Sequence, residues 1–140
     1  MALPTSLQLH IVSAERSLVD EPVDEVEIPG VDGYFGVLPG HTPLLALLGA
    51  GELWYRHGQE KTYLLIAFGF AEVQPDRVTI LAQTAEKAEE IDVARAEAAK
   101  KRAEERLAQP STDMDFERAR IAMMKALIRL QVSTRARIRS

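Results

Sequence analysis

Two spacings of apolar residues divide this chain. Up to about Gln83 the apolar positions alternate or form short runs, as in Leu7, Leu9 and Ile11. A period of two is typical of β-strands, whose successive side chains point to opposite faces. Turn signals interrupt the pattern at Glu21-Pro22, Pro29-Gly30, Asp32-Gly33, Gly49-Ala50-Gly51, His57-Gly58 and Pro75-Asp76. Residues 1–83 therefore predict a domain built as a β-sandwich of eight to ten short strands.

The second spacing begins after Gln83 and is typical of helices. Residues 84–109 contain no Gly or Pro and are rich in Ala, Glu, Lys and Arg, which favour helix. Pro110 breaks this helix, and Thr112 with Asp115 three residues later predicts the capped start of a second one. Residues 84–140 thus predict a second domain, an antiparallel hairpin of two helices.

The contact face of the first helix is predicted to be rich in small residues, and that of the second helix to be mainly large and apolar. On the first helix the expected face consists of Ala88, Ala99, Ala103 and Leu107. On the second it consists of Phe116, Ala119, Met123, Leu127 and Leu130. A further apolar strip contains Ile121, Met124, Ile128 and Val132, and we expect the sandwich or a partner subunit to cover it. Because alanine buries little area, compared with about 1.5 to 3 kcal/mol for a large apolar side chain, the hairpin should hold together weakly.

Charge differs between the two predicted domains. The net charge of the chain is −4, but residues 1–83 hold four Lys or Arg against eleven Asp or Glu, which gives −7. Residues 84–140 hold thirteen against ten, which gives +3, and no acidic residue follows Arg118. The C-terminal helix should therefore meet an acidic partner.

Composition excludes several classes of function. Cys is absent, so disulfide scaffolds and thiolate metal sites are excluded. The apolar stretches are shorter than the roughly 18 residues that span a bilayer, so we expect membrane association only through other proteins. His10, His41 and His57 lack the spacing of a metal site, and His41 stands where a phosphate loop would carry lysine. We expect neither a catalytic residue nor a bound metal.

Four segments carry a resemblance to a known family. The run 33–44, Gly-Tyr-Phe-Gly-Val-Leu-Pro-Gly-His-Thr-Pro-Leu, combines three glycines and two prolines. It is followed by the segments 68–73, 78–82 and 91–96. Together they resemble the epsilon subunit of the bacterial F-type ATP synthase over essentially the whole chain. The resemblance implies a non-catalytic central-stalk subunit at the cytoplasmic face of the cell membrane, in which the sandwich joins the gamma subunit to the c-ring.

The same resemblance assigns roles to individual residues. The hairpin would inhibit ATP hydrolysis by extending from the sandwich toward the alpha and beta subunits of the catalytic head. The residues expected to make inhibitory contacts are Arg118, Lys125, Arg129 and Arg135. The residues expected to dock the sandwich are Phe35, Gly36, Leu38, Pro39, Gly40 and His41.

A possible nucleotide site lies on the hairpin. With 3.6 residues per turn, Asp92, Arg95 and Arg102 share one side of the first helix. A basic strip of Arg118, Lys125 and Arg129 on the second helix would complete a cradle for a polyanion. The alternative is that Asp92 and Arg95 form an ordinary surface pair three residues apart.

Those family members that bind ATP on the hairpin carry an Ile or Leu, Asp, two free positions, Arg and Ala, as residues 91–96 do here. By resemblance, Asp92 would recognise the adenine or ribose, and the phosphates would be held by Arg95, Arg102 and Arg129. Ile91 and Ala96 would supply shape, and Glu86 matches a further family position. Lys125 departs from the family's arginine and lacks the planar fork, so ATP would bind more weakly as a regulatory ligand.

Two other functions compete with this interpretation. A freestanding module that binds anions or nucleic acid is suggested by Arg129, Arg135, Arg137 and Arg139. The acidic overall charge and the lack of aromatic residues between the C-terminal arginines argue against it, and we expect no nucleic-acid partner. A small sandwich enzyme or sugar-binding domain would need an acid and base pair that the sequence does not offer.

Overall fold

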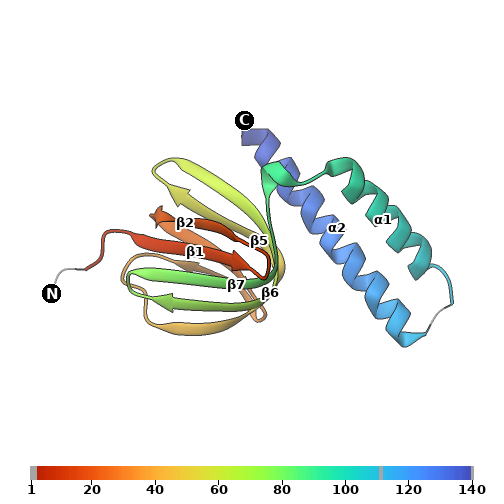
Figure 1. Cartoon of the computed structure of the whole chain (residues 1–140), viewed down its shortest axis with the longest axis horizontal. Coiled ribbons are helices and arrows are strands. Elements are labelled where there is room, and N and C mark those ends of the chain that lie inside the picture. Colours follow the sequence, from red (N-terminus) through yellow and green to blue (C-terminus); the bar gives the residue numbers. More distant parts are fainter. Residues whose placement is uncertain (1–2, 111, 140) are drawn as a thin grey trace. The chain divides into compact units, whose positions relative to one another are not determined.

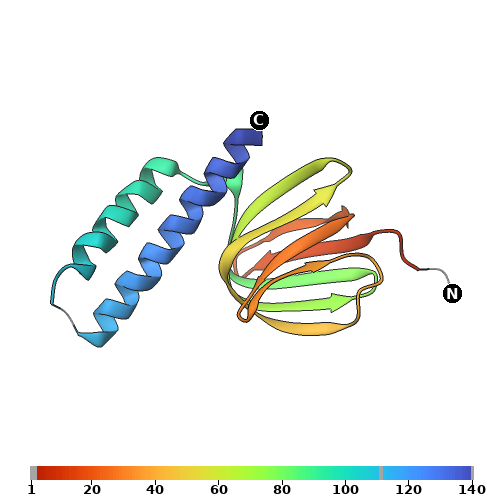
Figure 2. The same ribbon diagram turned by 180° about the vertical axis from the view of Figure 1, so that it is seen from behind.

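The chain forms two compact units, Met1–Lys87 and Ala88–Ser140. The computed structural model describes residues 3–110 and 112–139, with side chains up to residue 135, so the side chains of Arg137 and Arg139 lie outside the described residues. The first unit consists of strands and the second of helices (Figures 1 and 2).

In the described part of the first unit, seven strands form one continuous sheet. They are β1 (Leu7–Ser13), β2 (Ser17–Val23), β3 (Glu25–Gly30), β4 (Gly33–Val37), β5 (Leu44–His57), β6 (Glu60–Gln74) and β7 (Arg77–Lys87). Their order across the sheet is β2-β1-β7-β6-β5-β3-β4. β1 and β7 are parallel, and the other neighbours are antiparallel. The described residues thus contain fewer and longer strands than the turn signals predict.

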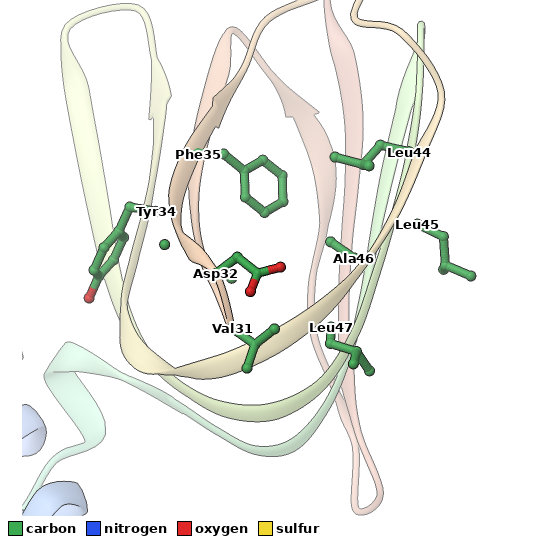
Figure 3. A pocket seen from close by; sticks show the side chains of 10 residues that line it. Val31, Asp32, Tyr34, Phe35, Leu44, Leu45, Ala46 and Leu47 are labelled. Carbon is green, nitrogen blue, oxygen red and sulfur yellow. The ribbon is translucent and has the colours of Figure 1, made fainter.

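The strand count is lower because β5 continues through Gly49. The pairing of β5 with β6 steps over Gly49 and Phe68, which leaves one residue on each strand outside the ladder. Phe68 and Gly69 have φ angles of 64° and 118°, which bend the strand locally. Figure 3 shows how strongly these ribbons curve. The glycines at 49 and 51 predict the end of a strand, but the chain bends there and the strand continues. The two long strands β5 and β6 therefore each take part in both layers of the sandwich.

Alternation along the strands fills the interior of the sandwich. The predicted triplet Leu7, Leu9 and Ile11 is completely buried, as are the alternate residues Leu64 and Ile66 of β6. The other large side chains of the core include Val26, Ile28, Leu53, Val78 and Ile80. Fully burying each such side chain contributes about 1.5 to 3 kcal/mol, so this core is the main source of stability in the first unit.

The predicted boundary between strands and helix is wrong by several residues. Residues 84–87 belong to β7 and pair with residues 64–67 of β6, so the strand extends past Gln83. A short 3-10 helix, η1 (Ala88–Glu90), follows, and α1 (Val93–Leu107) begins only after Asp92. The ladder to β6 satisfies the backbone of residues 84–87 and buries Ala85, which outweighs their preference for helix.

The second helix, α2 (Asp113–Arg139), starts where the sequence predicts. The Thr112 hydroxyl accepts a hydrogen bond of 3.2 Å from the backbone N–H of Asp115. This satisfies one of the amide groups that the first turn of a helix leaves without an intrahelical partner. α1 and α2 contact each other and run antiparallel (Figure 1).

The seam of the hairpin is formed by alanines. Ala96 and Ala103 of α1 are buried, as are Ala119 and Ala126 of α2. Both pairs are seven residues apart, so antiparallel packing can bring the four into one seam. Half-buried side chains flank them, namely Ala99, Leu107, Met123 and Leu130.

Two residues predicted for this seam face outward instead. Phe116 is 45% exposed and Leu127 is 47% exposed. Leu127 is adjacent in sequence to the buried Ala126 and therefore points about 100° away from it. Phe116 lies in the first turn of α2, beside the connecting loop. Which surface covers the second apolar strip of α2 stays a prediction.

Candidate functional site

The predicted docking run is partly a strand and partly a turn. Its first five residues form β4, and only the residues that follow make the expected tight turn. Gly40 has a φ angle of 86°, which glycine tolerates, and its N–H donates to the carbonyl of Pro75 over 2.7 Å. The His41 N–H donates to the carbonyl of Leu38 over 3.1 Å and closes the turn.

The six predicted docking residues do not share one surface. Phe35 points into the sandwich (Figure 3) and packs against the core, whereas Leu38 is exposed. Gly36 and Gly40 are exposed and offer backbone only, while Pro39 and His41 are half-buried. Leu38 is therefore the most exposed large apolar side chain of this set.

A row of exposed apolar side chains, not predicted from the sequence, crosses three strands. Leu47 of β5 pairs with Phe70 of β6, which pairs with Leu81 of β7. These side chains are 54%, 50% and 53% exposed, and the nearby Leu45 is 70% exposed. Their neighbours Leu48, Ala71, Ile80 and Ala82 are buried, so the row lies on the outer face. Consecutive apolar residues in 44–48 were the available signal, because strands that are apolar on both faces lose the alternation.

An apolar groove adjoins this row. It has a volume of about 530 Å³ and lies between the β3–β4 turn and the first residues of β5 (Figure 3). Its lining residues are Gly30, Val31, Asp32, Gly33, Tyr34, Phe35, Leu44, Leu45, Ala46 and Leu47. Asp32 is the one charged residue among these lining residues, and Figure 3 shows its carboxylate pointing from the turn toward the strand that carries Ala46. Such a groove suits an apolar side chain accompanied by a basic group.

Three of the predicted nucleotide residues, at the start of α1 and along it, are exposed, and one of them also caps the helix. Asp92 is the N-cap of α1, and its carboxylate accepts a hydrogen bond of 3.1 Å from the backbone N–H of Arg95. Both residues and Arg102 are exposed. Asp92 therefore contacts Arg95 as a helix cap, through the backbone of Arg95, and not through a pairing of the two side chains. The carboxylate already has a structural task.

Three other predicted nucleotide residues differ in their surroundings. Ala96 is buried in the seam of the hairpin, so its surface is not available to a ligand. Ile91 is half-buried, and its N–H donates to the carbonyl of Ala88 over 3.2 Å. Glu86 was expected in the first turn of a helix, but it lies on β7 opposite Leu65. The predicted helical position of Glu86 is wrong because the strand continues through residue 87, and its role in a nucleotide site stays a prediction.

The basic residues of α2 are spread along its length. Arg118 and Arg135 are exposed, and Lys125 and Arg129 are half-buried. Arg118, Lys125 and Arg129 follow each other at intervals of seven and four residues, which keeps them on one side of the helix. The same interval pattern was predicted from the sequence. Their role in binding a nucleotide stays a prediction.

An ion pair marks the start of α2. The guanidinium of Arg120 donates hydrogen bonds of 3.1 Å and 3.0 Å to the two carboxylate oxygens of Glu117. These hydrogen bonds, together with the charge of Arg120, lower the pKa of Glu117 below its ordinary value. Both side chains are exposed, so the pair contributes little to stability.

The described residues contain no cluster of three or more His, Cys, Asp or Glu that could hold a metal ion. Among the helices within the described residues, none has the length and hydropathy needed to cross a bilayer.

Fold and surface together define a two-module protein, a β-sandwich with an apolar outer patch followed by a helical hairpin with a basic second helix. The chain belongs to the ATP synthase delta/epsilon chain family: the family's beta-sandwich domain matches residues 6–88, and its long alpha-helix domain matches residues 89–134. Membership in this family favours the predicted subunit over a freestanding anion-binding module.

Relatives and solved structures agree with this assignment. The ATP synthase epsilon chain of Syntrophobacter fumaroxidans is 50% identical over 91% of this chain and 95% of its own length. That of Lawsonia intracellularis is 49% identical over 92% and 97%. A chain of the Euglena gracilis mitochondrial ATP synthase, solved with OSCP, F1 and c-ring, has a TM-score of 0.73 and 25% identity, covering 99% of this chain and 84% of that one. A chain from the Tetrahymena thermophila central stalk and c-ring shares the fold, with a TM-score of 0.66 and 11% identity over 94% and 99%.

Proposed function

We propose that this protein is a non-catalytic rotor subunit of an F-type ATP synthase. Its sandwich joins the gamma subunit to the c-ring, and its hairpin restrains ATP hydrolysis in the alpha and beta head. The observation that carries this proposal is that both family domains match in order, over residues 6–88 and 89–134. The protein would be peripheral, held at the cytoplasmic face of the bacterial cell membrane through the complex.

Docking is assigned to the apolar row Leu47, Phe70 and Leu81 together with the adjoining groove. The occupant proposed for the groove is an apolar side chain next to Lys or Arg on the rotor surface that gamma and the c-ring form. Charge supports this choice, because Asp32 lies among the groove residues and residues 1–83 carry a net charge of −7. A basic partner surface would be attracted and oriented by this charge.

Phe70→Ser tests the docking surface. Replacing a half-exposed phenylalanine that becomes buried on docking should weaken binding to the purified gamma and c-ring assembly about tenfold or more. Leu127→Ser is the matched control, because Leu127 is similarly exposed but lies on the hairpin. Binding that is unchanged in Phe70→Ser, or equally weakened in both variants, would contradict this surface.

Regulation is assigned to the hairpin because the contact between its two helices contributes little stability. Four buried alanines form it, and they supply little apolar area compared with leucines. α2 would then be able to leave the folded arrangement, and its basic residues would contact acidic segments of the catalytic subunits. Two arrangements of nearly equal free energy would make the hairpin a switch that a small ligand can shift.

A truncation tests the regulatory role, and the structure decides where to cut. Ending the chain after Lys87 keeps the whole of β7, whereas ending it after Gln83 would remove four residues that pair with β6. The sandwich has a core of its own and is a separate compact unit. The truncated protein should assemble normally and raise ATP hydrolysis. Normal assembly with unchanged hydrolysis would contradict the inhibitory role.

ATP is proposed as the ligand that favours the folded hairpin. Arg95, Arg102 and Arg129 would hold its phosphates, with Lys125 as a further cation and Asp92 at the adenine or ribose. A ligand that binds only the folded form at a hundred times its dissociation constant stabilises that form by about 2.7 kcal/mol. Abundant ATP would then hold the hairpin folded, and scarce ATP would release it to inhibit hydrolysis.

A titration of the isolated protein with ATP tests this site. Arg95→Ala should remove saturable binding in the millimolar range, while Lys125→Arg should tighten it several-fold because the guanidinium fork binds phosphate with two hydrogen bonds. Arg106→Ala is the matched control, since it removes an exposed arginine from the last turn of α1. No saturation at several millimolar ATP, or equal losses in Arg95→Ala and Arg106→Ala, would rule out the site.

A further inference from the structure

Tyr34 connects two strands that are not neighbours in the sheet. It lies on β4 opposite Pro29 of β3, and its hydroxyl accepts a hydrogen bond of 3.2 Å from the backbone N–H of Glu52 on β5. The side chain passes over Gly51, where an added Cβ would overlap the Tyr34 hydroxyl and lie 2.9 Å from the Pro29 Cβ. The edge strand is thereby tied across β3 to β5.

This tie lies where the regular ladder is interrupted. The pairing of β3 with β5 shifts between Glu27 and Gly30, and Pro29 has no N–H to donate. The backbone N–H of Glu52 therefore uses a side-chain acceptor in this stretch. The Tyr34 hydroxyl thus supplies an acceptor to a backbone N–H of β5 beside the place where the pairing with β3 is shifted.

The tied segment is also one wall of the apolar groove. Gly30 to Phe35 form this wall, and Leu44 to Leu47 of β5 form the other. Figure 3 shows Tyr34 directed away from Phe35, which points between the strands. Tyr34 thus ties the outer side of the wall to β5, while its neighbour Phe35 packs on the inner side against the core. Because this wall is held on both sides, it loses little conformational freedom when a partner binds.

We propose that Tyr34 is a positioning residue that fixes the β3–β4 turn against β5 and so keeps the groove in the shape that the rotor partner binds. This inference rests on the proposed docking function. It does not require Tyr34 itself to contribute most of the contact with the partner. Its effect would be to lower the ordering cost of docking.

Tyr34→Phe tests the role of the hydroxyl, because it removes the tie and keeps the ring. The full-length variant should bind the purified gamma and c-ring assembly about fivefold more weakly, as expected for one lost hydrogen bond. Amide hydrogen exchange at residues 31–35 should rise in the free protein. Tyr55→Phe is the matched control, because it removes a hydroxyl from a tyrosine of the sandwich core and leaves the groove intact. It should leave both readouts unchanged.

Leu45→Ser separates this inference from the docking proposal. If Leu45→Ser weakens binding and Tyr34→Phe changes neither affinity nor exchange at 31–35, the groove docks and the role of Tyr34 is overturned. If neither variant changes affinity, docking at the groove fails and the inference fails with it. If Tyr55→Phe weakens binding as much as Tyr34→Phe, general loss of stability explains the result, and the positioning role is overturned.

Discussion

The ring of Tyr34 occupies the space that a side chain at Gly51 would need. An added Cβ at position 51 would overlap the Tyr34 hydroxyl, and the next residue along, Glu52, donates its N–H to that hydroxyl. Glycine at this position is therefore required by a side chain from an edge strand. Neither residue reveals this relationship by itself, because they are separated by the turn at residues 38–43 and half of β5.

Gly51→Ala should destabilise the protein by about 1 to 3 kcal/mol, because the added methyl group overpacks against Tyr34. Part of this loss should disappear in a Tyr34→Ser background, whereas the contact of the added methyl group with the Pro29 Cβ at 2.9 Å remains. Urea denaturation of the four proteins measures the coupling. Gly36→Ala is the control, since an added Cβ at position 36 would meet no atom within 4 Å. Equal losses in both backgrounds would show that the clash with Tyr34 is not the cause.

The two tasks of Asp92 can be separated by substitution. Asp92→Ala should lower the stability of α1 by about 1 kcal/mol, because the N-cap is lost, whereas Asp92→Asn should retain most of it. If the carboxylate also recognises ATP, both variants should bind ATP more weakly than the wild type. Thermal melting followed by circular dichroism measures the cap, and calorimetric titration measures the ligand.

Thr112→Ala is the control for Asp92, because Thr112 caps α2 with the same kind of hydrogen bond. It should reduce helix stability without affecting ATP affinity. Full ATP affinity in Asp92→Asn would restrict Asp92 to its structural role and leave recognition to the arginines.

Ala126→Leu should open the hairpin. Ala126 is fully buried in the seam, and a leucine there would force α1 and α2 apart at a cost of about 1 to 3 kcal/mol. Amide exchange in both helices should accelerate, and in the assembled enzyme the released hairpin should inhibit hydrolysis more strongly. Leu127→Ala, on the exposed side of the same turn, should change stability by less than about 0.5 kcal/mol. If amide exchange in both helices is unchanged in Ala126→Leu, the close packing of α1 against α2 at this alanine is contradicted.

The pair of Glu117 and Arg120 predicts a small pH effect on α2. The folded-state pKa of Glu117 is lowered by hydrogen bonds from Arg120 and then by its charge. The stabilising effect is therefore present above the unfolded-state pKa and is lost as the pH falls through the folded-state pKa. Arg120→Gln should return the Glu117 pKa to its ordinary value in a carboxylate NMR titration. An identical titration in both proteins would show that the pair does not form in solution.

The module order was predictable because each module has its own sequence periodicity. Leu7, Leu9 and Ile11 alternate and are buried, and Thr112 caps α2 as its side chain suggests. The boundary was not predictable, because Glu86 and its neighbours favour helix when considered alone. They form a strand only because β6 offers backbone partners from far along the chain.

The candidate sites show the same division. The spacing of the basic residues on α2 follows from helix geometry, whereas the burial of Ala96 depends on how α1 packs against α2. The row of Leu47, Phe70 and Leu81 exists only when the registers of β5, β6 and β7 are known. No local pattern connects residues from three separate strands.

By itself the sequence determined that this protein has a strand-rich first part, a helical second part with a basic end, and the segments of its family. These properties depend on residues within a few positions of each other, so local spacing is enough to read them. Tertiary structure alone decided where β7 ends, that Tyr34 covers Gly51, and which apolar side chains face outward. The physical reason is that hydrogen-bond partners and burial are supplied by residues distant in sequence, and these contacts override local preference.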